Sequence, residues 1–196
     1  MAVVLVDAGG TNIGSVRYAL QRLGVDAALT ADATTIRAAD KVILPGVGAA
    51  GPGMARLREL GLVELMRSLT QPVLGVCLGM QLLCAHSEEG DTACLGLIPA
   101  TVRRFADRPG LRVPHMGWNG LSVQREHPLL HGLSAGEQAY FVHSYAVPLN
   151  EWTLASADYG EPFSAVVARG NFHGMQFHPE RSAAVGAKLL RNFLER

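Results

Sequence analysis

The chain has 196 residues and a formal net charge of zero, with 48% hydrophobic and 17% charged residues. This balance argues against disorder, and the zero charge leaves no basic field for nucleic acid or an anionic membrane. The length predicts a single domain over residues 1–196. The apolar run Val73–Leu83 is too short to cross a bilayer, and Met1–Asp7 lacks the basic start of a signal peptide. Three cysteines, an odd number, give no disulfide framework and favour the cytoplasm.

Strands alternate with helices in the first half of the chain. Short apolar runs predict buried strands, and helical spacing of apolar residues lies between them, interrupted once at Gly61. This alternation predicts a parallel sheet with right-handed crossovers. The expected strands are Ala2–Val6, Val25–Leu29, Lys41–Leu44 and Pro72–Val76, and the expected helices are Asn12–Leu23, Met54–Leu69 and Leu78–His86.

From Gly96 onward, strand-like segments separated by turns replace this alternation. The change predicts a mixed and partly antiparallel continuation of the sheet. An apolar stripe predicts a closing helix at Arg181–Leu194. The expected strands of this half are Leu97–Phe105, Gly120–Val123, Ala139–Val147, Thr153–Ala157, Ser164–Arg169 and Phe172–Phe177.

Cys77 lies in the most informative turn. A buried strand runs into Gly75–Gly79 and a helix follows, which is the nucleophile-elbow pattern with Cys in place of Ser. Glycines suit this turn because its backbone is strained and neighbouring side chains would collide. The helix N-terminus favours the thiolate, and the N–H of Leu78 is expected to face a developing oxyanion. A buried structural role is the alternative for a cysteine, and it is the one expected for Cys84 and Cys94.

His178 and Glu180 follow the last predicted strand. Pro179 ends that strand and stiffens the corner, so Glu180 is placed to orient one imidazole nitrogen while the other faces Cys77. This is the logic of a Cys-His-Glu triad, although a structural histidine stays the alternative for His178. No histidine pair has a metal-ligand spacing on a predicted helix, so no metal site is expected. Among the other histidines we expect His127 and His131 at the surface, His86 at a helix end and His173 in a structural role.

These motifs together resemble class I glutamine amidotransferases of the triad type. The resemblance implies a flavodoxin-like α/β fold, a three-layer sandwich around a central, mostly parallel mixed sheet. Within the class, other segments are similar to the glutaminase subunits of imidazole glycerol phosphate synthases, and the likeness extends from Val3 to Leu194. The class motifs are Pro45–Gly48, Gly75–Gln81 and Phe177–Glu180, and the segments of the narrower group are Pro114–Asn119, Tyr140–Tyr145 and Gly170–Glu180.

The resemblance also implies a role for each matched residue. Cys77 would attack the glutamine carboxamide to form a glutamyl thioester, and His178, oriented by Glu180, would protonate the leaving ammonia and then activate water. The chemistry implies no cofactor. An oxyanion hole would form from Leu78 and from the turn Gly46, Val47 and Gly48 after a peptide rotation. The residues implied in holding the substrate are Gln81, Glu89, His143, Ser144 and Tyr145.

A partner is implied as well, a (β/α)8-barrel cyclase that receives the ammonia and makes imidazole glycerol phosphate and AICAR in histidine biosynthesis. Trp118 lies in an apolar, aromatic segment that we expect to be a loop, and Trp is a common interface anchor. The alternative is that Trp118 covers the local core. The chain departs from the family pattern at Asp7–Gly10 and at Arg181, where the family commonly has Lys. Both departures affect how the chain is expected to dock against the cyclase. The residues implied at the interface are Asn12, Met116, Trp118, Asn119, Tyr140 and Arg181.

Three other functions are weighed against this one. The chain could serve another biosynthetic complex, such as aminodeoxychorismate or anthranilate synthase, but Pro114–Asn119 and Tyr140–Tyr145 speak against it. It could act alone as a thiol hydrolase of γ-glutamyl peptides. It could also be a non-enzymatic binding module, which would have no need of an intact Cys77, His178 and Glu180.

Overall fold

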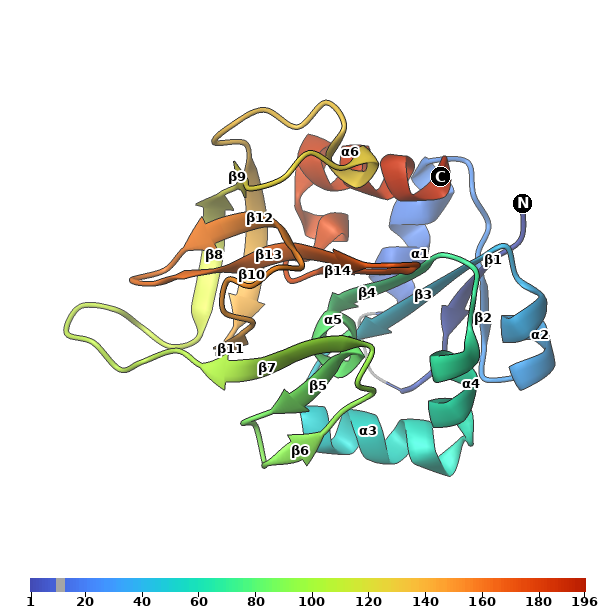
Figure 1. Cartoon of the computed structure of the whole chain (residues 1–196). Coiled ribbons are helices and arrows are strands. Elements are labelled where there is room, and N and C mark those ends of the chain that lie inside the picture. The colour runs from blue at the N-terminus through green and yellow to red at the C-terminus, as the bar shows by residue number, and fades with distance from the viewer. Residues whose placement is uncertain (10–12) are drawn as a thin grey trace.

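A computed structural model describes residues 1–9 and 13–196 of the chain. Within these residues the largest sheet has eight strands in the order β2-β1-β3-β4-β14-β13-β12-β9 (Figure 1). The strands from β2 to β14 are parallel, and β13, β12 and β9 are antiparallel to their neighbours. This confirms the α/β fold with a mostly parallel mixed sheet. The strands are β1 (Val3–Val6), β2 (Ala28–Thr30), β3 (Lys41–Gly46), β4 (Val73–Cys77), β9 (Ser122–Val123), β12 (Thr153–Asp158), β13 (Pro162–Arg169) and β14 (Phe172–Met175).

Helices cover both faces of this sheet and give the expected three layers. In Figure 1, α1 and α6 lie on one face, α3, α4 and α5 lie on the other, and α2 lies beside the β2 edge. Alternate residues of β1 explain the layering, because Val3 and Leu5 pack with α1 and α6 while Val4 and Val6 pack with α2 to α5. The helices are α1 (Ile13–Arg22), α2 (Ala33–Ala38), α3 (Ala50–Glu59), α4 (Leu62–Ser68), α5 (Leu78–Leu83) and α6 (Ala183–Leu194).

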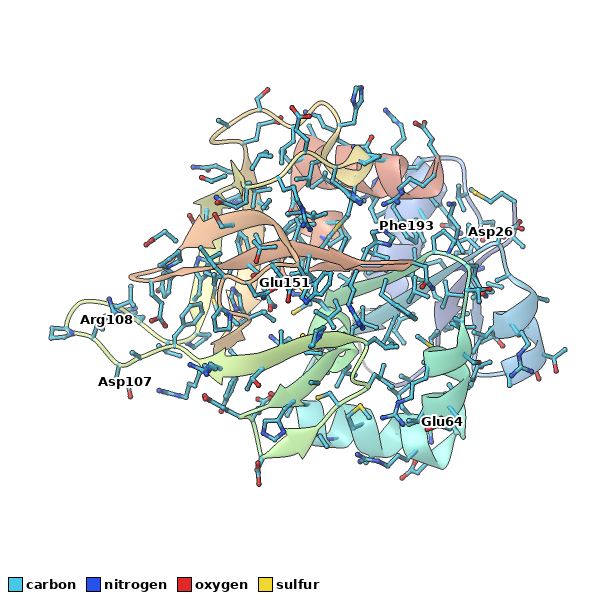
Figure 2. All side chains as sticks on the ribbon, in the orientation of Figure 1. Asp26, Glu64, Asp107, Arg108, Glu151 and Phe193 are labelled. Carbon is cyan, nitrogen blue, oxygen red and sulfur yellow. The ribbon has the colours of Figure 1, made fainter. Side chains whose placement is uncertain are left out.

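Two smaller sheets flank the carboxyl ends of the parallel strands. One contains β5 (Cys84–Ser87), β6 (Thr92–Ala93), β7 (Ile98–Arg104) and β11 (Tyr145–Ala146), and the other pairs β8 (His115–Gly120) with β10 (Gln138–His143). Short 3-10 helices, η1 (Pro128–Leu130) and η2 (Pro179–Arg181), precede β10 and α6. Figure 2 shows Asp107 and Arg108 on the loop that leads from β7 to β8, and Phe193 on the side of the sheet that α6 covers.

Several expectations about local structure were wrong. The helix expected over Leu78–His86 ends at Leu83, because the chain turns there to pair β5 with β7, so His86 lies in a strand, 3.2 Å from Asp91. The loop expected at Pro114–Trp118 is largely strand β8, which β10 pairs along its length. The strand expected from Val25 begins at Ala28, because the N–H of Val25 still bonds to Leu20 at the end of α1.

The break expected near Gly61 is confirmed, and it separates α3 from α4. Gly61 has a φ of +66°, a left-handed conformation that glycine adopts without a steric penalty. Helix α3 begins at Ala50, before the expected Met54, and the Glu89 carboxylate accepts the N–H of Ala50 at 2.9 Å. In residues 1–9 and 13–196, no helix has the length and apolar character needed to span a bilayer.

Three buried histidines make the fold sensitive to acid. Burial lowers the pKa of His143 to about 3 and the pKa of His115 and His173 to about 4. In the unfolded chain a histidine titrates at about 6.5, so the unfolded state binds more protons below that pH. We expect the free energy of unfolding to fall as the pH drops from 6.5 toward 4, by up to about 1.4 kcal/mol per pH unit for each histidine. Urea unfolding at pH 7.5, 6.0 and 5.0 measures this slope.

A variant pair separates the buried histidines from the rest of the chain. His173→Asn should flatten the dependence on pH, whereas His131→Asn, at an exposed position, should leave it unchanged. A urea midpoint that stays constant between pH 7.5 and 5.0 would contradict the expectation.

Candidate active site

Cys77 lies where β4 meets α5, and its backbone has the strained angles of a nucleophile elbow. Its φ is +52° and its ψ is −111°, a combination that L-residues rarely adopt. The flanking glycines are required by packing. A Cβ on Gly75 would lie 2.6 Å from the Gly79 carbonyl, and a Cβ on Gly79 would lie 1.8 Å from the Leu44 oxygen. The turn therefore forms only when both positions lack a side chain.

His178 and Glu180 follow β14, and His178 lies next to Cys77 in space, although it is far from it in the sequence. His178 Nδ1 and Glu180 Oε1 are 2.9 Å apart, and their side chains are 7% and 2% exposed. Burial disfavours the charged imidazole, but the hydrogen bonds to Cys77 and Glu180 and their negative charge outweigh it and raise the pKa of His178. This arrangement favours an imidazolium at His178, with the Cys77 sulfur on one side and the Glu180 carboxylate on the other.

A cavity of about 320 Å³ opens onto Cys77 and His178. A larger depression, about 800 Å³ and beside η1, contains none of the predicted site residues. The smaller cavity brings together segments that the sequence separates widely, and its size suits a small polar molecule. The other predicted residues in its wall are Val47, Gly48, Leu78, Gln81, Glu89, His143, Ser144 and Tyr145.

The turn Gly46–Gly48 lies directly beside the elbow. Gly46 ends β3 in register with Cys77, and a Cβ on Gly46 would lie 3.1 Å from Leu78. Gly46 is not in the cavity wall, whereas Val47 and Gly48 are. Gly48 has a φ of +94°, a conformation that favours glycine. The turn thus places backbone groups near the sulfur with few side chains in the way.

Three residues near the site were not predicted as site residues, and one of them, Pro114, lies in the cavity wall. Gln176 is fully buried, and its amide nitrogen lies 3.8 Å from the Cys77 sulfur. Val142 lies in the cavity wall with its carbonyl oxygen 4.0 Å from the same sulfur. A signal for Gln176 exists in the sequence, since it precedes His178 by two residues in an extended segment, and alternate residues of such a segment face the same side.

Met116, Trp118, Tyr140 and Arg181 lie together on one side of the β8–β10 pair and on η2, whereas Asn119 lies on the other face of β8, 3.4 Å from His115. Trp118 lies opposite Tyr140 in register, and their rings meet edge to face at 5.8 Å. The guanidinium of Arg181 lies 4.3 Å over the Tyr140 ring. Met116 is 63% exposed and Trp118 is 51% exposed, so Trp118 does not serve as a cover of the core. Asn119 donates to the Asp158 carbonyl at 2.7 Å, and Asn12 lies outside the described residues.

Comparisons with known proteins agree with this geometry. The family model described as glutamine amidotransferase class-I matches residues 4–196. The chain is 59% identical to the imidazole glycerol phosphate synthase subunit HisH of Xanthomonas euvesicatoria and 58% identical to that of Xylella fastidiosa strain Temecula1. Each alignment covers 98% of this chain and 96% of the relative.

Solved structures of low sequence identity share the fold. A crystal structure of a glutamine amidotransferase gives a TM-score of 0.77 at 24% identity and covers 100% of this chain and 98% of its own. The structure of PurLQS from Thermotoga maritima gives 0.73 at 19% identity and covers 99% and 97%. The nucleophile elbow, the cavity and the family match point the same way, and the chain belongs to the class-I glutamine amidotransferase family.

Proposed function

We propose that the chain is the glutamine-hydrolysing subunit of an imidazole glycerol phosphate synthase and converts L-glutamine to glutamate and ammonia. The observation that carries this proposal is the meeting of Cys77 and His178 at one cavity, with Glu180 bonded to His178 from behind. The HisH relatives, 56–59% identical along nearly the whole chain, support the choice of complex. The chemistry requires no metal or cofactor, and we infer a cytoplasmic location for this biosynthetic step.

In the first half of the reaction, the Cys77 thiolate attacks the carboxamide carbon of glutamine and the carbonyl π electrons move to its oxygen. The N–H groups of Leu78 and of Val47, after rotation of its peptide, donate to this oxyanion. The C–N bond then breaks, and the His178 imidazolium gives its proton to the departing nitrogen, which leaves as ammonia. The product of this half is a glutamyl thioester on Cys77 and a neutral His178.

In the second half, neutral His178 removes a proton from water while the water oxygen attacks the thioester carbon. The second tetrahedral intermediate expels the Cys77 thiolate and leaves the γ-carboxylic acid, which releases its proton to solvent and becomes glutamate. Glu180 accepts the Nδ1–H of His178 at 2.9 Å, which keeps the other nitrogen directed toward the reacting atoms in both halves. The raised pKa of His178 suits this cycle, because the imidazolium and the thiolate are restored together.

Substrate binding follows from the remaining wall of the cavity. The Glu89 carboxylate is the negative group available for the ammonium of glutamine, and its Oε2 also accepts the N–H of Ala50. The backbone of His143, Ser144 and Tyr145 together with the Gln81 side chain surrounds the rest of the molecule. These contacts hold the substrate so that its carboxamide faces the sulfur.

The exposed face on β8, β10 and η2 is the proposed docking site of the cyclase. It presents Met116, Trp118, Tyr140 and Arg181, and two of these are large apolar side chains that a partner would bury. Asn119 lies on the other face of β8, so its proposed role rests on the family resemblance. Arg181 offers a planar donor fork where a Lys would offer a point charge. The role proposed for Asn12 at this interface rests on the family resemblance alone.

An assay of the chain alone and with a histidine-pathway cyclase tests the proposal. We expect little glutamate release from the chain alone and a strong rise with the cyclase, largest when the cyclase holds its nucleotide ligand. High turnover without stimulation would indicate a free-standing hydrolase. No turnover in any mixture, with Cys77 unreactive toward a glutamine-analogue electrophile, would indicate a binding module.

Variants of exposed apolar residues make the assay specific to the docking face. Trp118→Ala should weaken cyclase binding by a factor on the order of 30, since truncating a buried aromatic anchor costs about 2 kcal/mol. Leu149→Ala is the matched control, because Leu149 is 43% exposed and lies outside the β8, β10 and η2 face. Equal effects of the two substitutions would rule out this docking face.

A further inference from the structure

Gln176 is a fully buried polar side chain next to the nucleophile, and the mechanism above does not use it. It is 0% exposed and follows β14 on the way to His178. A buried amide is stable only when its polar atoms are hydrogen-bonded. The partners of Gln176 therefore indicate what the side chain does.

The orientation of the Gln176 amide follows from its contact with Gln81, whose own amide is oriented by the backbone carbonyl of Tyr145. Gln81 Nε2 lies 3.0 Å from the Tyr145 carbonyl oxygen, and because a carbonyl only accepts, the Gln81 nitrogen must be the atom that faces it. The same nitrogen lies 3.0 Å from Gln176 Oε1 and donates to it. With its oxygen directed toward Gln81, Gln176 presents its N–H group to the Cys77 sulfur at 3.8 Å.

Two groups close to the sulfur act on it in opposite ways. The Val142 carbonyl oxygen, at 4.0 Å, accepts a hydrogen bond from the thiol and repels a negative sulfur. The Gln176 N–H donates, and a thiolate is a stronger acceptor than a thiol, so this contact favours the ionised form. Both contacts lie in a buried region, where hydrogen bonds and dipoles act more strongly than in water.

We infer that Gln176 is a catalytic residue whose amide stabilises the Cys77 thiolate, and that Gln81 positions that amide. The contact is available before the attack on the carboxamide and again when the thioester breaks and the sulfur departs as thiolate. The role in glutamine hydrolysis rests on the proposed function, whereas the hydrogen bond to the sulfur does not. Gln176 lies outside the cavity wall, so its loss is expected to lower kcat more than it raises KM for glutamine, which it reaches only through Gln81.

The pH dependence of Cys77 alkylation by iodoacetamide, without glutamine or cyclase, tests the inference directly. Gln176→Met keeps the approximate size and removes the donor. We expect the midpoint of the alkylation profile to move upward by about one pH unit, with alkylation about tenfold slower below it. Mass spectrometry of the Cys77 peptide isolates the signal. Burial raises the thiol pKa of Cys84 and, to about 11, that of Cys94, which keeps both unreactive in this range.

A matched control and a second variant complete the design. Gln71→Met removes a half-buried amide that donates to the Ile36 carbonyl near the opposite end of β4, and it should leave the alkylation midpoint in place. Gln81→Met should shift the midpoint upward, and adding it to Gln176→Met should shift it no further, because the two act through one contact.

Three outcomes would decide the matter. A Gln176→Met protein with a lower melting temperature and an unchanged alkylation profile has lost only packing, which overturns the inference. If this variant does not fold, Gln176→Leu also removes the donor and adds no charge near the sulfur. An upward shift then supports the inference and an unchanged midpoint overturns it. If the midpoint shifts but the chain hydrolyses no glutamine with any cyclase, the hydrogen bond to the sulfur is supported and the proposed function is rejected.

Discussion

Cys77→Ala should lower glutamine hydrolysis by a factor on the order of 10⁴ to 10⁶, the loss typical when a covalent nucleophile is removed. No other nucleophile replaces the sulfur, since Cys84 and Cys94 are buried away from the cavity wall. Cys77→Ser should fail as well, because the hydroxyl is far less acidic than a thiol and stays protonated beside His178. The measurement is glutamate and ammonia release in the presence of the liganded cyclase.

The same variant complex should still make product from added ammonium salts, because the cyclase reaction needs only ammonia. Alanine keeps the backbone of the elbow, so the free energy of unfolding should change by less than about 1 kcal/mol. Retained use of ammonia together with lost use of glutamine assigns Cys77 to the hydrolysis. Loss of both activities would assign it a docking or folding role.

Gly79→Ala should prevent the chain from reaching its native fold. The added Cβ would lie 1.8 Å from the Leu44 carbonyl oxygen and 2.9 Å from its carbon, which is far inside van der Waals contact. Leu44 lies in the centre of the sheet, in register with Gly75 of the neighbouring strand, so relief would require α5 to separate from β3. We expect a loss of more than about 4 kcal/mol in the free energy of unfolding, a magnitude at which many domains no longer fold.

Gly14→Ala is the matched control for this substitution. Gly14 lies in α1, and its added Cβ would meet only the edge of the Tyr18 ring at 4.0 Å. Alanine there should stabilise the helix by about 0.5–1 kcal/mol. Soluble yield and the urea midpoint measure both variants, and a Gly79→Ala protein that unfolds at the parental urea concentration would refute the packing argument.

The helices and strands that could be predicted from the sequence are those whose structure depends on residues close by in the same segment. The strand before Cys77, the glycines around it and the helix after it form one local motif, and each glycine has a steric reason within the same turn. Alternation of strands and helices then predicts a parallel sheet, at whose carboxyl edge Cys77 and His178 meet.

The largest errors arose where the pairing partner lies outside the local segment. Cys84–Ser87 continues the apolar pattern of α5, but the pairing with β7 converts it into strand β5. His115–Gly120 has the glycines and polar residues of a loop, and β10 nevertheless pairs with every residue of it. Periodicity contains no information about such partners, so tertiary pairing overrides it.

The sequence by itself therefore determined the class of fold and predicted the nucleophile and the base that we propose, because local sterics and hydrophobic periodicity mark these segments. Only the tertiary structure decided which side chains share the space around the sulfur. It placed Gln176 against Cys77, Glu89 at the start of α3, and Arg181 over Tyr140. These contacts join residues far apart in the chain through packed layers, and their distances depend on how the sheets and helices close together.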